Sequence, residues 1–355
     1  MIINRDNPNN STDVLTIRST NTDQHLTGGV VKTVVVTGAG GFIGGHLTRR
    51  LVTEGHDVVA IDGKPLTNWY QVSSGAKNYS ADAGDSDLME RLFQGASEIY
   101  HLAADMGGMG FIELNKLDCM LTVETSVGAL KAASTVGVDR FFFASSACVY
   151  AAQYQQSEAA TPLAEHMAYP AMPEDGYGWE KLFTERLCRH FREDRSLATR
   201  VGRYHNVYGP HGTWRGGREK APAAVCRKIA EAVLSGNHEI EIWGDGNQTR
   251  SFMYVDDCVE GTIRLLRSNF VDPLNIGTEE LVTINQLVSI VEQIAGIEVH
   301  RRYNLEAPQG VRGRNSDNRL LREILEWEPS IPLLDGLEQT YAWVYKQMIE
   351  DTGPR

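Results

Sequence analysis

A glycine-rich turn between an apolar run and a helical segment constrains the fold of this chain more than any other feature. Residues 33–37 (Thr-Val-Val-Val-Thr) form a short β-branched run that is typical of a buried parallel strand. Gly38, Gly41 and Gly44 follow, and glycines at this spacing permit a tight turn and a close approach of the backbone to a pyrophosphate. The segment 43–54 has a helical pattern, so its amino terminus would present free N–H groups to the phosphates.

The next apolar run ends in a carboxylate that completes a dinucleotide site. Residues 57–61 are typical of a second strand, and Asp62 follows them, 18 residues after Gly44. An acid at this distance is placed to bond the adenosine ribose hydroxyls, and it would repel a 2′-phosphate. The sequence therefore predicts that the chain binds NAD in preference to NADP, with Phe42 and Ile43 in the same turn.

A pair of serines ends an aromatic strand further along the chain. Residues 139–145 include three consecutive phenylalanines, and Ser145 and Ser146 close the run. Open α/β sheets bind their ligands at the carboxyl ends of the strands, so these hydroxyls are candidates for substrate contacts. The alternative is ordinary turn chemistry, in which a serine hydroxyl bonds only its own backbone.

Tyr177 and Lys181 stand four residues apart, on one face of a helix and one turn from each other. A free phenol, with a pKa of about 10, is a poor base at neutral pH, and a nearby ammonium lowers that pKa. The pair could then take a proton from a sugar hydroxyl while the nicotinamide takes the hydride, with Ser146 relaying the proton. A tyrosine and a lysine at this spacing more often serve packing and surface, and the strand-end serines upstream favour the catalytic interpretation.

The order of apolar runs and amphipathic segments predicts an α/β fold, a Rossmann-type doubly wound parallel sheet with a smaller C-terminal substrate-binding α/β lobe. The expected strands are 33–37, 57–61, 98–103, 139–145 and 198–204, with helices at 43–54, 86–94, about 112–136 and 176–193. We expect an NAD-binding domain over 31–210, a return to it near 250–278, and the lobe over 211–350, with helices near 219–235, 284–295 and 335–350 and a strand at 239–243. Residues 1–30 are polar and predict a disordered tail.

Charge and cysteine usage exclude several classes of protein. The net charge of −12 argues against binding to a nucleic-acid backbone, which is itself negatively charged. No apolar run reaches about 18 residues, so no membrane span is expected. The five cysteines, at positions 119, 148, 188, 226 and 258, are scattered and odd in number, which favours neither a disulfide framework nor a metal site. Free thiols are typical of the reducing cytoplasm, where we expect this protein.

Together these motifs resemble the extended short-chain dehydrogenase/reductase family, which contains NAD-dependent epimerases and dehydratases of nucleotide sugars. Within that family, residues 102–112, 145–148, 212–224, 243–252 and 310–318 are similar to the GDP-mannose 3,5-epimerases. The resemblance runs from about residue 31 to about residue 348, and the blocks 212–224 and 310–318 are more specific than the shared dehydrogenase motifs. It implies that NAD oxidises a GDP-hexose at C4, that C3 and C5 of GDP-mannose are inverted, and that GDP-L-galactose or GDP-L-gulose is released.

Inverting a carbon beside a 4-ketone takes a base on one face of the ring and an acid on the other. Cys148 and Lys220 match the family at the two positions, although a cysteine in an apolar stretch is usually packed and a loop lysine is usually solvated. A cysteine near a lysine or a positive nicotinamide ring can have a lowered pKa. Arg250, Arg314 and Lys228 are the candidates for the diphosphate, because arginine offers a planar fork to phosphate.

The resemblance also implies further contacts. The remaining substrate-binding residues would be Gly107, Ser145, Ser146, Asn206, Glu219, Ala221, Gln248 and Thr249, and Asp82 would face the adenine. Arg215, Arg218 and Arg312 are interpreted as surface or supporting residues. By the same resemblance, the helices near 112–136 and 176–193 would pair with those of a second copy in a homodimer.

One departure from the family pattern lies close to the sugar site. The family usually has proline after Ser-Ser-Ala-Cys-x-Tyr, where this chain has Ala151 and Ala152. Another nucleotide-sugar 4-epimerase or a dehydratase is an alternative, although dehydratases of this group carry an acidic pair where this chain has Ala147 and Cys148. An NAD-sensing regulatory protein is a further alternative, but it would have no use for the whole set of candidate catalytic residues.

Overall fold

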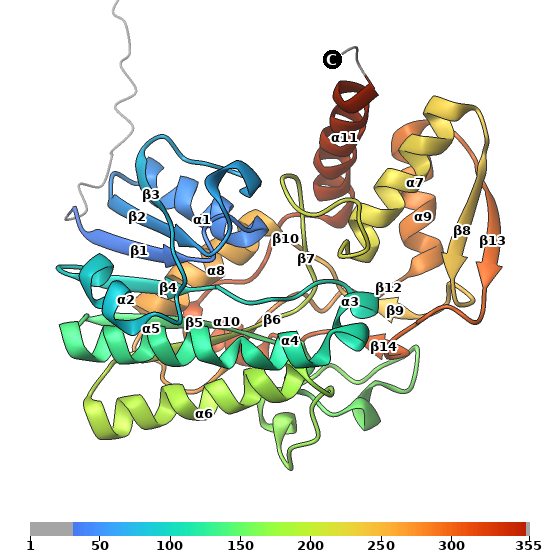
Figure 1. The fold of residues 1–355 in the computed structure, drawn as a ribbon. Coiled ribbons are helices and arrows are strands. Elements are labelled where there is room, and N and C mark those ends of the chain that lie inside the picture. The colour runs from blue at the N-terminus through green and yellow to red at the C-terminus, as the bar shows by residue number, and fades with distance from the viewer. Residues whose placement is uncertain (1–30, 353–355) are drawn as a thin grey trace, which may run out of the picture. The chain divides into compact units, whose positions relative to one another are not determined.

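The computed structural model describes residues 31–352, and the expected disordered tail over 1–30 lies outside them. Seven parallel strands form the central sheet, in the order β11-β6-β5-β4-β1-β2-β3 (Figure 1). Their bounds are β1 Thr33–Thr37, β2 Asp57–Asp62, β3 Ala76–Ser80, β4 Glu98–His101, β5 Arg140–Ser146, β6 Thr199–Tyr204 and β11 Leu274–Ile276. The order reverses between β1 and β4, and doubly wound sheets bind their ligands at such a point. The predicted Rossmann-type fold is confirmed.

Alternating valines of β1 face the two sides of the sheet. Val34 and Val36 pack into one core and Val35 into the other, and all three are fully buried. Burial of each such side chain contributes about 1.5–3 kcal/mol. The first face carries α1 (Phe42–Thr53) and α8 (Val255–Arg267), and the second carries α2 (Ser86–Phe93), α5 (Val123–Val136) and α6 (Tyr177–Arg195).

The helix expected over 112–136 is instead three helices, so that prediction is wrong. They are α3 (Met109–Leu114), α4 (Lys116–Leu121) and α5. Asn115 leaves the helical conformation at φ −127° and its side chain donates to the Phe111 carbonyl oxygen at 2.8 Å, which ends α3. Thr122 separates α4 from α5, and its hydroxyl accepts from the Asp105 amide at 3.0 Å. Short polar side chains here compete with the helical hydrogen bonds.

Apart from β11, the strands after residue 210 lie outside the central sheet. Three helices, α7 (Ala221–Ser235), α9 (Ile284–Ala295) and α11 (Leu333–Thr352), pack together beside a parallel pair of strands, β8 (Glu239–Trp243) and β13 (His300–Asn304) (Figure 1). Two smaller sheets join β12 (Val282–Thr283), β9 (Thr249–Arg250) and β14 (Gly313–Arg314), and β10 (Met253–Tyr254) with β7 (Val207–Tyr208). In the register of β9 and β14, Arg250 lies opposite Arg314.

Residues 250–278 supply α8 and β11, which lie on and beside the central sheet. The strand β11 and the helix α10 (Arg319–Leu325) were not among the expected elements. The division into an NAD-binding domain and a substrate lobe stays a prediction, because residues from 31 onward group as one compact unit.

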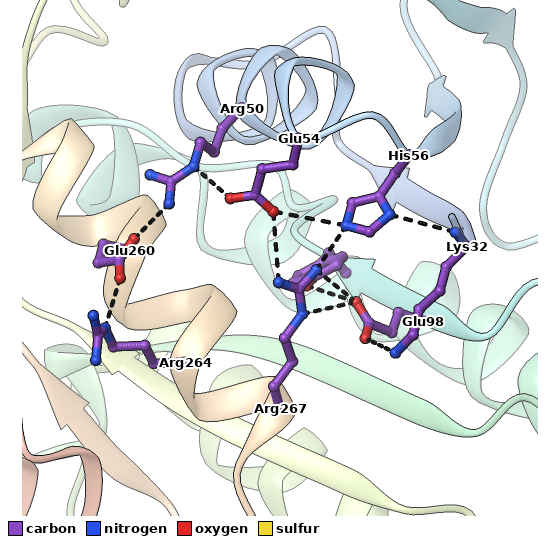
Figure 2. Close-up of polar contacts among 9 residues, drawn as sticks. Lys32, Arg50, Glu54, His56, Glu98, Glu260, Arg264 and Arg267 are labelled. Atoms are coloured by element: carbon purple, nitrogen blue, oxygen red, sulfur yellow. Dashed lines mark hydrogen bonds and ion pairs between the residues drawn. The ribbon is translucent and has the colours of Figure 1, made fainter. Parts of the chain in front are cut away.

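A polar cluster joins α1 and α8 to the amino ends of β1 and β4 (Figure 2). Glu98 is fully buried at the start of β4, where it accepts from Lys32 Nζ at 2.8 Å and from Arg267 Nη2 at 3.3 Å. Arg267 also donates to His56 Nε2 at 3.1 Å. This cluster lies at the opposite strand ends from the cavity described below, so we assign it to the fold.

Across residues 31–352, no helix is long and apolar enough to cross a bilayer. All five cysteines are buried and free. The same described part of the chain holds no group of three or more histidine, cysteine or acidic side chains placed to bind a metal ion.

Candidate active site

A cavity of about 790 Å³ opens at the carboxyl ends of the central strands. The sequence-predicted residues that line it are Gly38, Gly41, Phe42, Ile43, Gly44, Asp62, Asp82, Gly107, Ser145, Ser146, Tyr177 and Lys220. Those outside its lining are Cys148, Lys181, Asn206, Glu219, Ala221, Lys228, Gln248, Thr249, Arg250 and Arg314. The fold thus brings the cofactor candidates and most of the catalytic candidates to one cavity.

The glycine turn fits a dinucleotide phosphate. Gly38 has φ +75°, and a Cβ there would lie 2.7 Å from the Ala103 nitrogen. A Cβ on Gly44 would lie 2.1 Å from the Gly38 carbonyl oxygen, so α1 can approach the turn only with glycine at this position. The N-cap residue of α1 is Gly41, which has no side chain to bond the first amides of the helix. Amide donors of the first turn therefore stay open to an anion.

Asp62 stands at the end of β2 and is held by two backbone amides. Its Oδ2 accepts from Gly40 at 3.1 Å and its Oδ1 from Lys64 at 3.0 Å. A carboxylate has about four acceptor positions, so ribose hydroxyls can still bond to it. Lys64 lines the same end of the cavity and donates its ammonium to the Gly40 carbonyl at 3.0 Å, which the sequence did not suggest. Asp82, beyond β3, accepts from the Gly84 amide at 2.8 Å.

Tyr177 is the first residue of α6 and is buried. Lys181 Nζ lies 5.4 Å from the centre of the Tyr177 ring and 3.1 Å from Glu180 Oε2. Burial raises the pKa of Tyr177 well above its usual value, and a hydrogen bond with Ser146 opposes the rise. The expected lowering of this pKa is wrong, because the phenol is desolvated and the charges of Cys148 and Glu180 oppose its ionisation.

The two serines at the end of β5 have different partners. Ser145 is buried and donates to Glu185 Oε1 at 2.6 Å, and Glu185 in turn binds Arg203 at 2.7 Å. The Ser145 hydroxyl therefore donates its hydrogen within the protein rather than to a ligand. Ser146 accepts from the Cys148 amide at 3.2 Å and bonds Tyr177, so it is the serine whose hydroxyl serves the site.

Cys148 follows β5 in a short turn and is buried. Burial first, and then the Glu174 carboxylate, raise the pKa of Cys148 to about 12, while Arg314 opposes them with Nη1 3.8 Å from the sulfur. The expected lowering of the Cys148 pKa is therefore wrong. Burial is the larger cause, and Glu174, which adds to it, is a residue that the sequence analysis did not consider.

Lys220 is the N-cap residue of α7 and reaches the cavity. Burial and, to a smaller extent, the Arg314 cation lower the pKa of Lys220, whereas Cys148 raises it. Beside it, Glu219 accepts from the Gly217 amide at 2.7 Å. Arg218, interpreted above as a surface or supporting residue, lines the cavity and pairs with Asp105 at 2.6 Å.

Arg250 and Arg314 form a cationic pair behind Cys148. Arg250 donates to the carbonyls of Thr249 at 2.8 Å and Val311 at 2.5 Å, and burial followed by Arg314 lowers the pKa of Arg250 to about 9. Lys228 donates to the Glu241 carbonyl at 2.6 Å. The amides of Asn206 and Gln248 and the Thr249 hydroxyl donate to the carbonyls of Ser251, Trp243 and Glu158.

A model of the NAD dependent epimerase/dehydratase family matches residues 34–277. The chain belongs to this family. GDP-mannose 3,5-epimerase 1 from Oryza sativa subsp. japonica is 46% identical over 316 residues, which cover 89% of this chain and 82% of that protein. The resemblance inferred from the motifs is thus confirmed.

Solved structures of nucleotide-sugar epimerases have the same fold. UDP-glucose 4-epimerase from Thermotoga maritima, crystallised with UDP-glucose, superposes with a TM-score of 0.80 at 27% identity, covering 89% of this chain and 99% of that one. UDP-glucuronic acid 4-epimerase from Bacillus cereus, crystallised with UDP-glucuronic acid and NAD, has a TM-score of 0.74 at 27% identity with the same coverage. The site residues described above therefore belong to an NAD-dependent member of this family.

Glu174, Lys64 and Arg218 are the residues at this family member's site that the motifs did not reveal. Lys64 follows Asp62 by two residues, so its nearness could have been read from the sequence. Glu174 lies three residues before Tyr177. Its nearness to the site could not have been predicted, because the contact between this segment and Cys148 is known only from the structure.

Proposed function

We propose that this chain epimerises GDP-mannose at C3 and C5 through a 4-keto intermediate and releases GDP-L-galactose, GDP-L-gulose or both. The observation that carries the proposal is the meeting of Ser146, Tyr177 and Lys220 in one cavity, with Cys148 in electrostatic reach of Tyr177 and Lys220. This set offers one group for the C4 hydroxyl and two more for the neighbouring carbons. The rice relative, named a GDP-mannose 3,5-epimerase, supports the choice of substrate.

Tyr177 is proposed to take the proton of the C4 hydroxyl. Ser146 bonds Tyr177 and is placed to hold the same sugar oxygen. The Lys181 ammonium, 5.4 Å from the centre of the Tyr177 ring, stabilises the phenolate by charge once it forms. The glycine turn and Asp62 would hold NAD, which would supply a reversible hydride acceptor for C4, so the cycle would bring no net oxidation.

Cys148 and Lys220 are proposed to exchange protons with C3 and C5. Hydrogens on these carbons become acidic because both carbons are α to the C4 ketone. Burial raises the pKa of Cys148 to about 12 and lowers that of Lys220, which reverses the usual order of a thiol and an amine. Burial makes it costly for either group to hold a charge, so Lys220 as an ammonium gives up its proton more readily than a solvated lysine would.

Arg250, Arg314 and Lys228 are proposed to hold the diphosphate. Arg250 and Arg314 lie opposite each other in neighbouring strands, and their mutual repulsion contributes to the lowered pKa of Arg250. A diphosphate beside them would relieve that repulsion and would accept charge-assisted hydrogen bonds. By resemblance, the remaining substrate contacts named above are proposed to keep their family roles.

A homodimer in the cytoplasm is proposed as the working form. Large apolar side chains of α3, α4 and α6 are exposed on neighbouring helices, at Leu114, Leu117, Met120, Trp179 and Phe183. Monomeric proteins rarely leave such a patch in water, and its position agrees with the helix pairing expected for this family. Five buried free thiols suit a reducing compartment.

Product analysis tests the function. The purified protein is incubated with GDP-mannose, and the GDP-sugars are separated and identified by NMR. The proposal expects galactose or gulose configuration, whereas a 4-epimerase would give the talose configuration and a dehydratase a 4-keto-6-deoxy sugar. Cys148→Ser and Lys220→Ala should each bind GDP-mannose and fail to release an epimer; full activity in both would refute the proposed roles.

A further inference from the structure

Glu174 is held against Cys148 by the backbone as well as by side chains. Its amide donates to the Cys148 carbonyl at 3.0 Å. The same carbonyl lies so close to the first turn of α6 that a Cβ on Gly178 would sit 2.3 Å from it. Arg314 donates one guanidinium nitrogen to Glu174 Oε1 and another to Cys148 Sγ, at 3.8 Å. The carboxylate, the guanidinium and the thiol therefore form one fixed group.

One oxygen of Glu174 is left over in this arrangement. Oε2 is buried and accepts no hydrogen bond from any residue within 31–352. Only 12% of the Glu174 side chain is exposed, so solvent has little access to it. An unpaired buried carboxylate oxygen is costly, and a neighbouring thiol proton can satisfy it. The other titratable or charged groups that act on Cys148 are Arg314, Tyr177, Lys220 and Arg250, so Glu174 is the carboxylate among them.

We propose that Glu174 is a positioning residue for proton transfer, which receives the thiol proton of Cys148 while the sulfur takes a proton from the sugar. This inference rests on the function proposed above and adds a residue to it. A buried thiol that rests protonated needs such an acceptor before its sulfur can act as a base. Glu174 is the group in contact with the thiol that can fill this role.

The transfer balances without an oxidant or a further reactant. The C–H bond beside the C4 ketone breaks as a new S–H bond forms on Cys148, and the electron pair moves onto the ketone oxygen as an enolate. The original S–H bond breaks as an O–H bond forms on Glu174 Oε2. Lys220, as an ammonium, then gives a proton to the opposite face of the same carbon and becomes a neutral amine. The proton held by Glu174 returns through solvent to this amine, which restores the starting carboxylate and ammonium.

Glu174→Gln tests the inference, because an amide keeps the shape and the bond to Arg314 but cannot take a proton. In D₂O with GDP-mannose, the variant should exchange deuterium into the sugar about tenfold or more slowly than wild type. Trapping of the 4-keto sugar with borodeuteride should stay within about twofold, since Tyr177 and Ser146 are untouched. Glu174→Asp should recover part of the exchange.

Asp175 provides a matched control. It is the next residue, it is also acidic, and it pairs with Lys116 in solvent at 2.8 Å. Asp175→Asn removes the same charge from the same loop, and exchange should remain at the wild-type rate. Equal losses in Glu174→Gln of deuterium exchange, 4-keto trapping and GDP-mannose binding would indicate a purely structural role and would overturn the inference.

Alkylation of Cys148 gives a readout that needs no sugar. Iodoacetamide labelling of the Cys148 peptide is followed by mass spectrometry across pH in wild type, Glu174→Gln and Asp175→Asn. Loss of the carboxylate should move the labelling midpoint down by about half a pH unit or more, and only in Glu174→Gln. An unmoved midpoint would show that Glu174 does not act on the thiol.

The combined outcomes separate the inference from the function beneath it. A lower labelling midpoint with slower exchange supports the proton transfer. A lower midpoint with equal or faster exchange overturns it, because Glu174 would then only oppose the thiolate. Absence of exchange in the wild type would overturn the proposed function itself, whatever the variants do.

Discussion

Burial decides the charge state of the reacting residues at this site. It raises the pKa of Tyr177 and Cys148 and lowers that of Lys220, so it works against the charged form of each. Sequence reasoning named these three residues as catalytic candidates, but it assigned the wrong direction to the pKa shifts of Tyr177 and Cys148. The cause is burial first and then neighbouring charges such as Glu174 beside Cys148, and both depend on the tertiary structure.

Tyr177→Phe removes the acceptor for the C4 hydroxyl proton and little else. Turnover of GDP-mannose should fall by about 10²–10⁴-fold, the usual contribution of a positioned acid–base group. NAD should remain bound, because the glycine turn and Asp62 are unchanged; release and quantification of the nucleotide checks this. Tyr79→Phe, at an exposed tyrosine outside the cavity, is the control. Turnover near that of wild type would remove Tyr177 from the mechanism.

Asp62 should make the protein prefer NAD to NADP. A carboxylate that bonds ribose hydroxyls contributes about 1.5–3 kcal/mol, which corresponds to roughly tenfold or more in affinity. Lys64 Nζ lies at the same end of the cavity and would attract a 2′-phosphate, so the preference should largely disappear in Asp62→Asn. Titration of the apoprotein with both nucleotides measures it, and tighter NADP binding by wild type would contradict the assignment.

At the scale of elements, local patterns were the more predictable part. The strand, glycine turn and helix over 33–54 follow from residues close in sequence, and the structure has them as β1 and α1. The break at Asn115 was missed because one side-chain hydrogen bond decides it. The strand β11, of 3 residues, was missed because a short edge strand carries little periodicity of its own.

The polar cluster of Figure 2 should make stability fall in acid. Burial raises the pKa of Glu98, but the hydrogen bond from Lys32 and the charge of Arg267 outweigh it, and the net pKa is lowered. A carboxyl with a depressed folded pKa stabilises the protein above its unfolded pKa of about 4.3, and this contribution is lost as pH falls through the folded value.

Glu98→Gln should therefore cost about 1–3 kcal/mol near neutral pH, at the low end because Lys32 and Arg267 are both over a third exposed. Urea unfolding at pH 7 and at pH 4 measures it, and the difference from wild type should shrink at the lower pH. Lys77→Ala, in the exposed pair with Asp57, should cost little. A pH-independent difference would mean that the charge of Glu98 does not stabilise the fold.

For the whole molecule, the apolar patch on α3, α4 and α6 predicts association. Light scattering at micromolar concentration should give about twice the chain mass of 39.3 kDa. Phe183→Glu places a charge in the patch and should shift the protein toward monomer, whereas Leu234→Glu, at an exposed leucine of α7, should leave the dimer intact. A wild-type protein that stays at the monomer mass would contradict the homodimer.

Deuterium uptake from solvent tests the central claim most directly. Wild-type protein is incubated with GDP-mannose in D₂O, and the recovered sugar is examined by NMR at each carbon. Epimerisation through a 4-ketone requires solvent exchange beside the ketone, so deuterium should enter at C3 and C5. The hydrogen on C4 should be retained, because it would be transferred to NAD and back as a hydride. Product formation with deuterium at neither C3 nor C5 would contradict the account, because Cys148 and Lys220 would then exchange no protons with the sugar.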